Sequence, residues 1–282
     1  MTMKRLYLII LVAVLSGLTA VARKHKQLVI LHTNDTHSCV MPLSENLENK
    51  DIAGRAGFLR RIAMVKEERQ KCPDLLLFDS GDFSQGSGYY TLFKGEVEVG
   101  LMNRMGYDAV TIGNHEFDFG LDNLARLFRM ATFPVVCSNY DCTGTVLEGL
   151  VKPYIVLKRR GLKIGVFALS TALKGLVSDR NCEGLTFLDP VETAQKYIDI
   201  LRRQEKCDLV ICLSHLGWNG SGFSDAQFLS AIEGCDLVLG GHTHTYMREL
   251  EYAPDKNGKL IPDDQNGKHG VFVGKLLLDM VK

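Results

Sequence analysis

Short apolar runs alternate with amphipathic segments along the chain, and this alternation predicts an α/β fold. Strands are expected at residues 28–32, 74–78, 109–112, 134–137, 154–157, 163–169, 209–213, 237–239 and 270–280. Helices are expected at residues 53–71, 91–105 and 120–130, from Pro190 with an apolar face reaching Leu201, and at 225–232. Residues 253–270 are rich in Asp, Asn, Gly and Lys, which predicts a surface loop. No internal repeat is visible, so we expect one domain.

The first 22 residues have the pattern of a secretory signal peptide. Lys4 and Arg5 precede an apolar run at residues 6–18, and Ala20 and Ala22 form the small-x-small pattern that signal peptidase recognises. The run is well short of the roughly 20 residues that a membrane-spanning helix requires, although a retained anchor is the alternative. We therefore expect an exported protein, periplasmic or extracellular, whose folded domain is residues 23–282 and which has no membrane attachment after cleavage.

Composition narrows the possible functions. The chain has 282 residues, is 46% hydrophobic and 23% charged, and holds seven prolines, which is typical of a globular protein and excludes disorder as its main feature. Lys and Arg together number 33, and so do Asp and Glu. Without excess positive charge, a protein dedicated to nucleic acid or to anionic membrane surfaces is not expected.

Eight cysteines in an exported protein raise the question of disulfides. Cys212 lies inside the apolar run at residues 209–213, and Cys137 follows another apolar run, where a thiol behaves as a small hydrophobic side chain. No C-x-x-C pair indicates a zinc or redox site. We expect mostly free, buried thiols, with Cys137 and Cys142 as the first pair to test for a bridge.

Polar clusters follow the predicted strands at several places, where the side chains of an α/β protein converge on one crevice. The first cluster holds Asp35 and His37, whose one-residue gap in an extended segment puts both on the same side. The second holds Asp82 between Gly81 and Gly86, and these glycines permit a tight turn beside a ligand. Taken alone, each cluster could be an ordinary turn.

Two further clusters contain candidate metal ligands, and the first of them also contains candidate acid–base groups. Residues 113–118 combine Asn114, a neutral oxygen ligand, with His115 and Asp118, an imidazole and a carboxylate that can orient it for acid–base catalysis. The last cluster comprises residues 214–215, with His215, and residues 240–244. Here the same one-residue gap predicts that His242 and His244 point the same way, with glycines leaving room beside a metal.

Together the clusters supply seven candidate metal ligands, which is enough for two ions that share one carboxylate. The seven are Asp35, His37, Asp82, Asn114, His215, His242 and His244. We expect Asp82 to bridge, with Asp35, His37 and His244 on one ion and Asn114, His215 and His242 on the other. Nitrogen and oxygen donors without thiolate suit two divalent ions of Zn, Mn, Fe or Co, and do not choose among them.

In their order along the chain, the clusters resemble those of the calcineurin-like dinuclear metallophosphoesterases. They read D-x-H, G-D-x-x-Q-G, G-N-H-E-F-D, S-H and G-G-H-T-H. More narrowly, the sequence from about Val29 to Leu278 is similar to the N-terminal catalytic domain of the 5'-nucleotidase and UDP-sugar hydrolase family, including the closing pattern from Gln265 to Leu276. This resemblance implies a single domain with a four-layer α/β/β/α sandwich and metals at the sheet edges.

The resemblance also implies a reaction. The expected activity is hydrolysis of the phosphate monoester of a 5'-nucleotide by water activated between two metal ions. His115, held by Asp118, is expected to stabilise the transition-state charge and to protonate the leaving oxygen. The alternatives are a 2',3'-cyclic-nucleotide phosphodiesterase, a nucleotide-sugar hydrolase, a broad phosphoesterase, a sulfur-ester hydrolase, and a binding protein that retains the fold.

The sequence departs from the family at two points, and the first of them bears on specificity. Many members carry a further domain whose aromatic residues clamp the nucleoside base, and this sequence reaches Lys282 without it. We therefore expect either a broad set of small-molecule phosphoesters or a separate chain that supplies the clamp. In addition, His244 stands where some members have Gln.

The remaining polar residues receive simpler interpretations. His32 is expected to be a packed histidine behind the site, and His25 and His269 are expected to be solvated. Arg60 and Arg61 are expected on an exposed helix face. Arg55 is expected to be exposed too, with reach into the crevice as the alternative.

Overall fold

The structure is a computed structural model that describes residues 25–219 and 222–281, so the signal peptide predicted at residues 1–22 lies outside the described residues. The strands are β1 (His25–Thr33), β2 (Leu76–Asp79), β3 (Ala109–Val110), β4 (Val135–Val136), β5 (Tyr140–Asp141), β6 (Val151–Lys152), β7 (Tyr154–Arg159), β8 (Leu162–Ser170), β9 (Thr186–Phe187), β10 (Leu209–His215), β11 (Leu237–Leu239), β12 (Glu251–Pro254), β13 (Leu260–Asp264) and β14 (Gly274–Val281). The helices are α1 (Phe58–Lys71), α2 (Gly88–Phe93), α3 (Glu96–Met105), α4 (Gly120–Met130), α5 (Pro190–Asp199) and α6 (Asp225–Ala231), with short turns η1 (His115–Phe117), η2 (Asp179–Asn181) and η3 (Ile200–Gln204).

The strands form two six-stranded sheets. The first has the order β14-β1-β2-β3-β4-β6 and the second the order β12-β13-β11-β10-β8-β7, while β5 and β9 pair separately. Most neighbours within the large sheets are parallel; the exceptions are β14 on β1, β12 on β13 and β7 on β8. Because parallel strands end at the same edge, the loops that follow them gather at one edge of each sheet.

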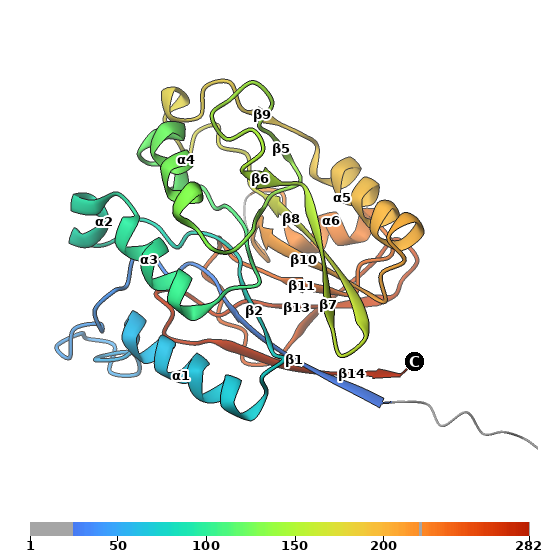
Figure 1. Cartoon of the computed structure of the whole chain (residues 1–282), viewed down its shortest axis with the longest axis horizontal. Coiled ribbons are helices and arrows are strands. Elements are labelled where there is room, and N and C mark those ends of the chain that lie inside the picture. The colour runs from blue at the N-terminus through green and yellow to red at the C-terminus, as the bar shows by residue number, and fades with distance from the viewer. Residues whose placement is uncertain (1–24, 220–221, 282) are drawn as a thin grey trace, which may run out of the picture.

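Alternating side chains build a four-layer sandwich from these sheets. In β2, Leu77 packs among residues of α1, α3 and α4, whereas Leu76 and Phe78 belong to a core between the two sheets. In β10, Cys212 packs with residues of α5 and α6, whereas Ile211 faces the same inter-sheet core. Figure 1 shows α1, α3 and α4 on one side of the sheets and α5 and α6 on the other. The α/β/β/α architecture implied by the resemblance is confirmed.

Two predicted helices differ from the observed ones because of left-handed backbone. The helix expected at residues 53–71 begins only at Phe58, since Gly54, Ala56 and Gly57 have φ values of 69°, 66° and 92° that no right-handed helix accepts. The helix expected at residues 91–105 is divided into α2 and α3, because Lys94 and Gly95 adopt φ values of 51° and 95°.

The loop expected at residues 253–270 is wrong in part. Two strands, β12 and β13, pair antiparallel there, and β13 also pairs with β11. Ala253 and Ile261 are buried in the core beneath α5 and α6, and these two apolar contacts anchor a segment whose composition is otherwise polar. The last strand begins at Gly274 rather than at residue 270.

The cysteines are as expected. All eight are free, and six of them are buried, so Cys137 and Cys142 form no bridge.

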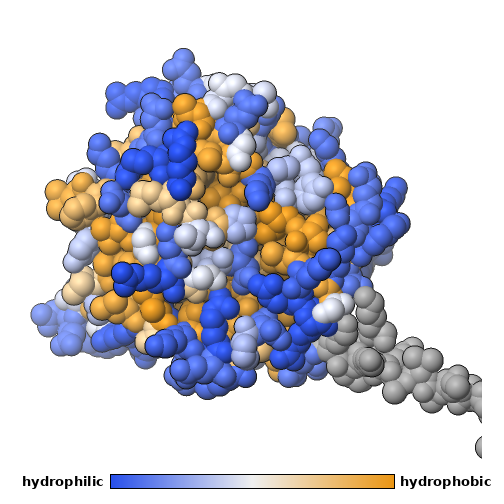
Figure 2. All heavy atoms as spheres, in the orientation of Figure 1, coloured by the Kyte–Doolittle hydropathy of each residue, from blue (hydrophilic) through white to orange (hydrophobic). Residues whose placement is uncertain are grey.

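Within the described part of the chain, no helix has both the length and the apolar character needed to cross a membrane. Figure 2 shows hydrophilic side chains spread across the visible face, with hydrophobic patches between them.

Candidate metal centre

Loops from both sheets bring the predicted ligands together. Asp35 and His37 follow β1, Asp82 follows β2, His215 ends β10, and His242 and His244 follow β11. Three overlapping groups have ligand atoms within 4.8 Å of one another: Asp35, His37 and His244; Asp82, His215 and His242; and His37, Asp82 and His115. The first two groups are the two predicted ligand sets, apart from Asn114.

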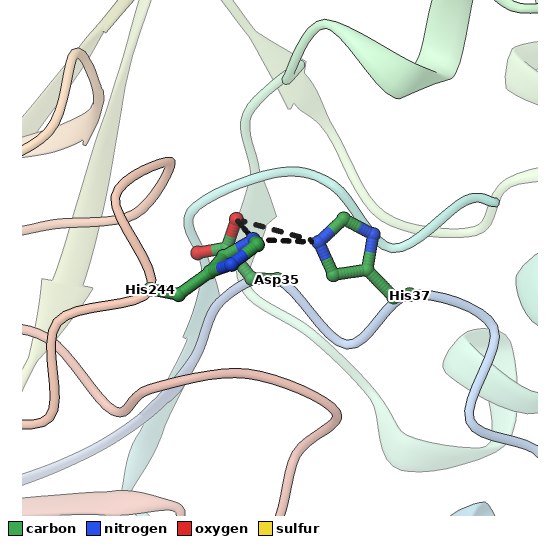
Figure 3. A group of neighbouring side chains, drawn as sticks. All are labelled: Asp35, His37 and His244. Atoms are coloured by element: carbon green, nitrogen blue, oxygen red, sulfur yellow. Dashed lines mark hydrogen bonds and ion pairs between the residues drawn. The ribbon is translucent and has the colours of Figure 1, made fainter. Parts of the chain in front are cut away.

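The first group places two imidazoles against one carboxylate. His37 Nε2 lies 2.9 Å from His244 Nε2 and 3.8 Å from Asp35 Oδ1. His244 Nε2 lies 3.4 Å from the same Asp35 oxygen. Figure 3 shows Asp35 and His37, from the loop after β1, facing His244, from the loop after β11. Nitrogen and oxygen lone pairs gathered this closely form a donor set for a cation.

The second group contains buried atoms that lack partners. His215 Nδ1 donates to the backbone oxygen of Ser80 at 2.7 Å, which leaves a lone pair on Nε2. That Nε2 makes no hydrogen bond, although it lies 3.2 Å from Asp82 Oδ2, and the buried Asn114 Oδ1 is also unpartnered. Unsatisfied buried polar atoms cost about 1–3 kcal/mol each. A cation between these atoms satisfies them, so the residues present fit a divalent metal.

The backbone at the ligands is strained. Asp35, His37, Asp82, His242 and His244 all have positive φ, between 42° and 73°. Left-handed conformations at residues other than glycine are uncommon and concentrate at functional sites. The expectation that Asp35 and His37, or His242 and His244, lie on the same side through extended alternation is therefore wrong in its reason. Asp35 and His37 do fall in one donor group, whereas His242 and His244 belong to different groups.

Glycines let the ligand loops approach one another. A Cβ on Gly113 would overlap Asp82 Oδ1 and would lie 2.7 Å from His215 Nε2. A Cβ on Gly241 would lie 2.9 Å from His215 Nδ1. These distances are too short for any side chain, so both positions need glycine for the ligands to keep their places.

His115 and Asp118 form the predicted pair at the rim of the cluster. His115 Nδ1 lies 3.1 Å from Asp118 Oδ2, and each side chain is 32% exposed. The hydrogen bond to Asp118 raises the pKa of His115. The backbone N–H of His115 also donates to Asp82 Oδ1 at 2.9 Å. The imidazole is thus fixed beside the ligands while it stays open to solvent.

Burial and neighbouring charges set the protonation of the other groups. Burial lowers the pKa of His37, and burial together with His215 lowers that of His242 to about 4, so both imidazoles are neutral near pH 7. Burial opposes the charge of Asp82, but the adjacent His215 outweighs it and holds the pKa of that carboxyl below its usual range. His37 and His242 therefore present neutral nitrogens and Asp82 an ionised carboxylate, the forms that bind metal. Burial alone would lower the pKa of His215, but the adjacent Asp82 outweighs it and raises that pKa to about 10, so this imidazole must lose a proton when it binds metal.

Sequence reasoning missed the residues that support the ligands. Glu116 is fully buried, and its carboxylate accepts the backbone N–H groups of Asp82, Ser84 and Gly113 at 2.9, 3.0 and 2.6 Å. Asn34 Nδ2 donates to Asp35 Oδ2 at 2.6 Å. Both residues lie close in sequence to predicted ligands, and this position was the only indication of their role in the sequence. It did not show that their side chains hold the ligand loops together.

The structure shows where His32, His269 and Arg61 lie. His32 is fully buried and bonds Asp264 Oδ2 through Nε2 at 2.8 Å, as expected of a packed histidine. His269 is half-buried with its ring centroid 6.0 Å from that of His37, so the expectation of a solvated residue is wrong. Arg61 is also not exposed, because its guanidinium packs 4.0 Å above the Phe58 ring.

Comparison with known proteins identifies the family. The profile described as calcineurin-like phosphoesterase matches residues 28–246, most of the chain. The chain belongs to the calcineurin-like phosphoesterase family. Membership places it among hydrolases of phosphoester bonds, a family that implies divalent metal ions.

Individual relatives agree with this family. A snake venom 5'-nucleotidase from Gloydius brevicauda is 34% identical over 81% of this chain and 39% of its own length. The trifunctional nucleotide phosphoesterase protein YfkN of Bacillus subtilis is 30% identical over 88% of this chain and 18% of its own. The solved 5'-nucleotidase precursor from Thermus thermophilus is 30% identical with a TM-score of 0.82, over 89% of this chain and 51% of that chain. The chain thus spans less than half of the length of these two curated relatives.

Proposed function

We propose that this calcineurin-like phosphoesterase hydrolyses nucleotides, and first of all the phosphate monoester of 5'-nucleotides. The observation that carries the proposal is the pair of donor groups that meet at Asp82, where Asn114 Oδ1 and His215 Nε2 are buried without partners. The relatives named as 5'-nucleotidases and nucleotide phosphoesterase support the nucleotide as substrate.

The chain's own residues have distinct roles in this reaction. Asp35, His37 and His244 would hold one divalent ion, and Asn114, His215 and His242 the other, with Asp82 shared. When bound, the two ions supply electrostatic stabilisation of the phosphoryl oxygens and lower the pKa of water so that it attacks phosphorus. Fixed ligand loops, tied together by Glu116, hold the phosphate in place for an in-line attack.

His115 acts on the leaving group. Its Nδ1 faces Asp118, so Nε2 is the atom available to substrate. Because Asp118 raises the pKa of His115, the imidazole keeps a proton that it can donate to the leaving oxygen. An alkoxide is a poor leaving group, and this protonation gives the nucleoside as a neutral alcohol.

The proposal includes the place of action and the source of specificity. The pattern of residues 1–22 supports export to the periplasm or the extracellular space. A separate chain that supplies a nucleoside clamp is the alternative to recognition by this chain alone. Turnover before and after removal of co-purifying proteins separates these two cases.

Metal analysis combined with phosphate release tests the function. The protein is loaded with Zn, Mn, Fe or Co and assayed with nucleoside 5'-monophosphates, 2',3'-cyclic nucleotides and nucleotide sugars. We expect two ions per chain and the fastest turnover with 5'-monophosphates. Asp82→Asn is the control and should lose metal and activity together. A metal-loaded protein that releases no phosphate from any of these substrates would contradict the proposal.

A further inference from the structure

A pocket of about 490 Å³ lies directly beside His37, and its lining residues include no Lys, Arg, Asp or Glu. Met41, Tyr89, Leu92 and Phe93 line it, and all four of these large apolar residues are exposed. Single exposed apolar side chains are ordinary on a protein surface, whereas several around one hollow are typical of a binding site. We call this hollow the apolar pocket.

One face of α2 forms the aromatic wall of the apolar pocket. Tyr89, Leu92 and Phe93 are three and four residues apart, a spacing that puts them on the same side of a helix. All three line the pocket, whereas Tyr90, on another side of α2, is buried. Aromatic side chains stack against flat rings, so this face of α2 suits a heteroaromatic ligand.

Hydrogen bonds connect α2 to the metal centre on two sides. Ser87 is the N-cap of the helix, and its Oγ accepts backbone N–H groups of the first turn. The same oxygen lies 2.5 Å from the Oγ of Ser38, the residue next to His37. On the other side, Tyr90 Oη donates to the backbone oxygen of His115 at 3.1 Å. A ring bound in the apolar pocket would therefore keep a defined position relative to both histidines.

The leaving group of the proposed reaction lies close to this pocket. In that reaction the leaving oxygen faces His115, and the nucleoside is attached to this oxygen. The ring centroid of His115 lies 5.4 Å from that of His37, which lines the apolar pocket. A nucleobase is a flat, uncharged heteroaromatic ring, and it therefore matches a pocket with aromatic walls and without charged Lys, Arg, Asp or Glu side chains.

We propose that the apolar pocket is the subsite for the nucleobase of the substrate, which stacks against the Tyr89 and Phe93 face of α2. This inference rests on the proposed function, with the phosphate at the metal ligands. It assigns recognition of the base to this chain itself, without a clamp from a partner chain. Because every base has a flat π face, stacking predicts a preference for nucleotides over simple sugar phosphates, with little discrimination among the bases.

Adenosine 5'-monophosphate and ribose 5-phosphate test the subsite, because both carry a phosphate on ribose and only the first has a base. KM and kcat are measured for the wild type and for Phe93→Ala. We expect KM to rise on the order of tenfold for the nucleotide and to stay within about twofold for the sugar phosphate. Phe93→Trp keeps an aromatic ring and should keep the low KM. Tyr252→Ala, which removes an exposed aromatic side chain of β12, is the matched control and should change neither KM.

Calorimetric binding of adenosine gives a readout apart from turnover, because adenosine has no phosphate to be cleaved. Weaker binding to Phe93→Ala than to the wild type supports the subsite, even where no nucleotide is hydrolysed and the proposed function therefore fails. Turnover of both phosphates with equal changes in KM would uphold the proposed function but overturn the inference, because the variant would then have moved α2 rather than removed a stacking partner. No binding of adenosine to the wild type, or unchanged values in both Phe93→Ala and Tyr89→Ala, would overturn it as well.

Discussion

At the scale of single residues, the candidate site divides into residues proposed to hold metal and residues proposed to act on substrate. The metal-binding candidates Asp35, Asp82 and His215 are at most 2% exposed. His115 and Asp118 are each about one third exposed, and the clearest link of His115 to the ligands is its backbone N–H bond to Asp82. A substitution of the His115 side chain can therefore remove chemistry while it leaves the metal ligands in place.

We expect His115→Asn to lower kcat by roughly 10²–10⁴-fold, the usual contribution of a general acid. The asparagine is close in size, and the backbone N–H that holds Asp82 is retained. Phosphate release from a 5'-monophosphate measures turnover, and elemental analysis of the same sample should still find two ions. Turnover equal to the wild type would disprove the role of His115, and loss of metal would show that it is a ligand instead.

The sequence predicted which candidate ligands lie together but not how their backbone brings them together. The positions of Asp82 and His215 after strands were enough to predict that they meet, since parallel strands end at one edge. The left-handed backbone of His37 and His244 was not predictable, because only a small minority of histidines adopt that conformation and the surrounding contacts impose it here. Likewise, the burial of Arg61 depends on where α1 packs, which a count of charged residues does not show.

At the scale of secondary structure, the loops determine the geometry of the candidate site more than the strands do. Strands such as β2 and β10 were predictable because their apolar runs are continuous and buried in the sheets, whereas β12 and β13 were missed because their sequence is mostly polar. The four layers were not predictable from the hydrophobic pattern of the strands. That pattern indicates that both faces of a strand are buried, but it does not indicate whether a helix or a second sheet covers each face. Core strand β10 illustrates this, since Cys212 and Leu213 are equally buried against different layers.

Gly113→Ala should disable the metal centre. The added Cβ would overlap Asp82 Oδ1 and would meet His215 Nε2 at 2.7 Å, so both ligands must move. We expect metal affinity to fall by at least about tenfold and activity to fall with it. Gly100→Ala is the control: it lies in α3 with nothing within 4 Å of the new Cβ, and it should stabilise the protein by about 0.5–1 kcal/mol. Metal titration and thermal unfolding check both; unchanged affinity in Gly113→Ala would refute the packing argument.

The buried carboxyls of Asp225 in α6 and Asp263 in β13 should make stability depend on pH. Burial raises the pKa of Asp225 from 3.8 to about 7, and Asp263 is raised too, by burial and by Asp225. A raised carboxyl pKa in the folded state means that the folded protein binds the proton more tightly, so the contribution of these two carboxyls to stability is greatest below about pH 4 and is lost as pH rises through about 7.

The measurement is the free energy of unfolding of the wild type and of Asp225→Asn between pH 4 and pH 8. We expect the wild type to lose about one to a few kcal/mol relative to the variant over this range. Asp122→Asn, which removes an exposed carboxylate in α4, should keep the wild-type slope. Parallel curves for the wild type and Asp225→Asn would contradict the prediction.

At the scale of the whole molecule, the balance of charge changes meaning once the site is known. With equal numbers of basic and acidic residues a dedicated polyanion binder is not expected, yet the proposed substrate is itself an anion. Two divalent cations would supply positive charge at the position of the phosphate, without a net positive chain. A protein without net charge can therefore bind a small anion at one site without a surface charge that attracts nucleic acid.

Removing metal should destabilise the entire fold, because the ligands come from loops of both sheets. Without a cation, the carboxylates of Asp35 and Asp82 remain buried, and His215 Nε2 and Asn114 Oδ1 remain unpartnered. A metal present at about 100 to 1,000 times its Kd stabilises the folded state by roughly 3–4 kcal/mol through mass action. For a domain of this size, that corresponds to a fall in Tm of roughly 5–15 °C after chelation.

Scanning calorimetry of the protein dialysed against a chelator, and again after addition of Zn or Mn, measures this difference. The wild type should recover its Tm on addition of metal. Asp82→Asn lacks the shared ligand, so its Tm should respond only weakly to either treatment. The contrary outcome is a wild-type Tm that does not change on chelation, in a sample that elemental analysis shows to have lost its metal. It would mean that the loops hold their positions without ions and that the metal centre does not stabilise the packing of the two sheets.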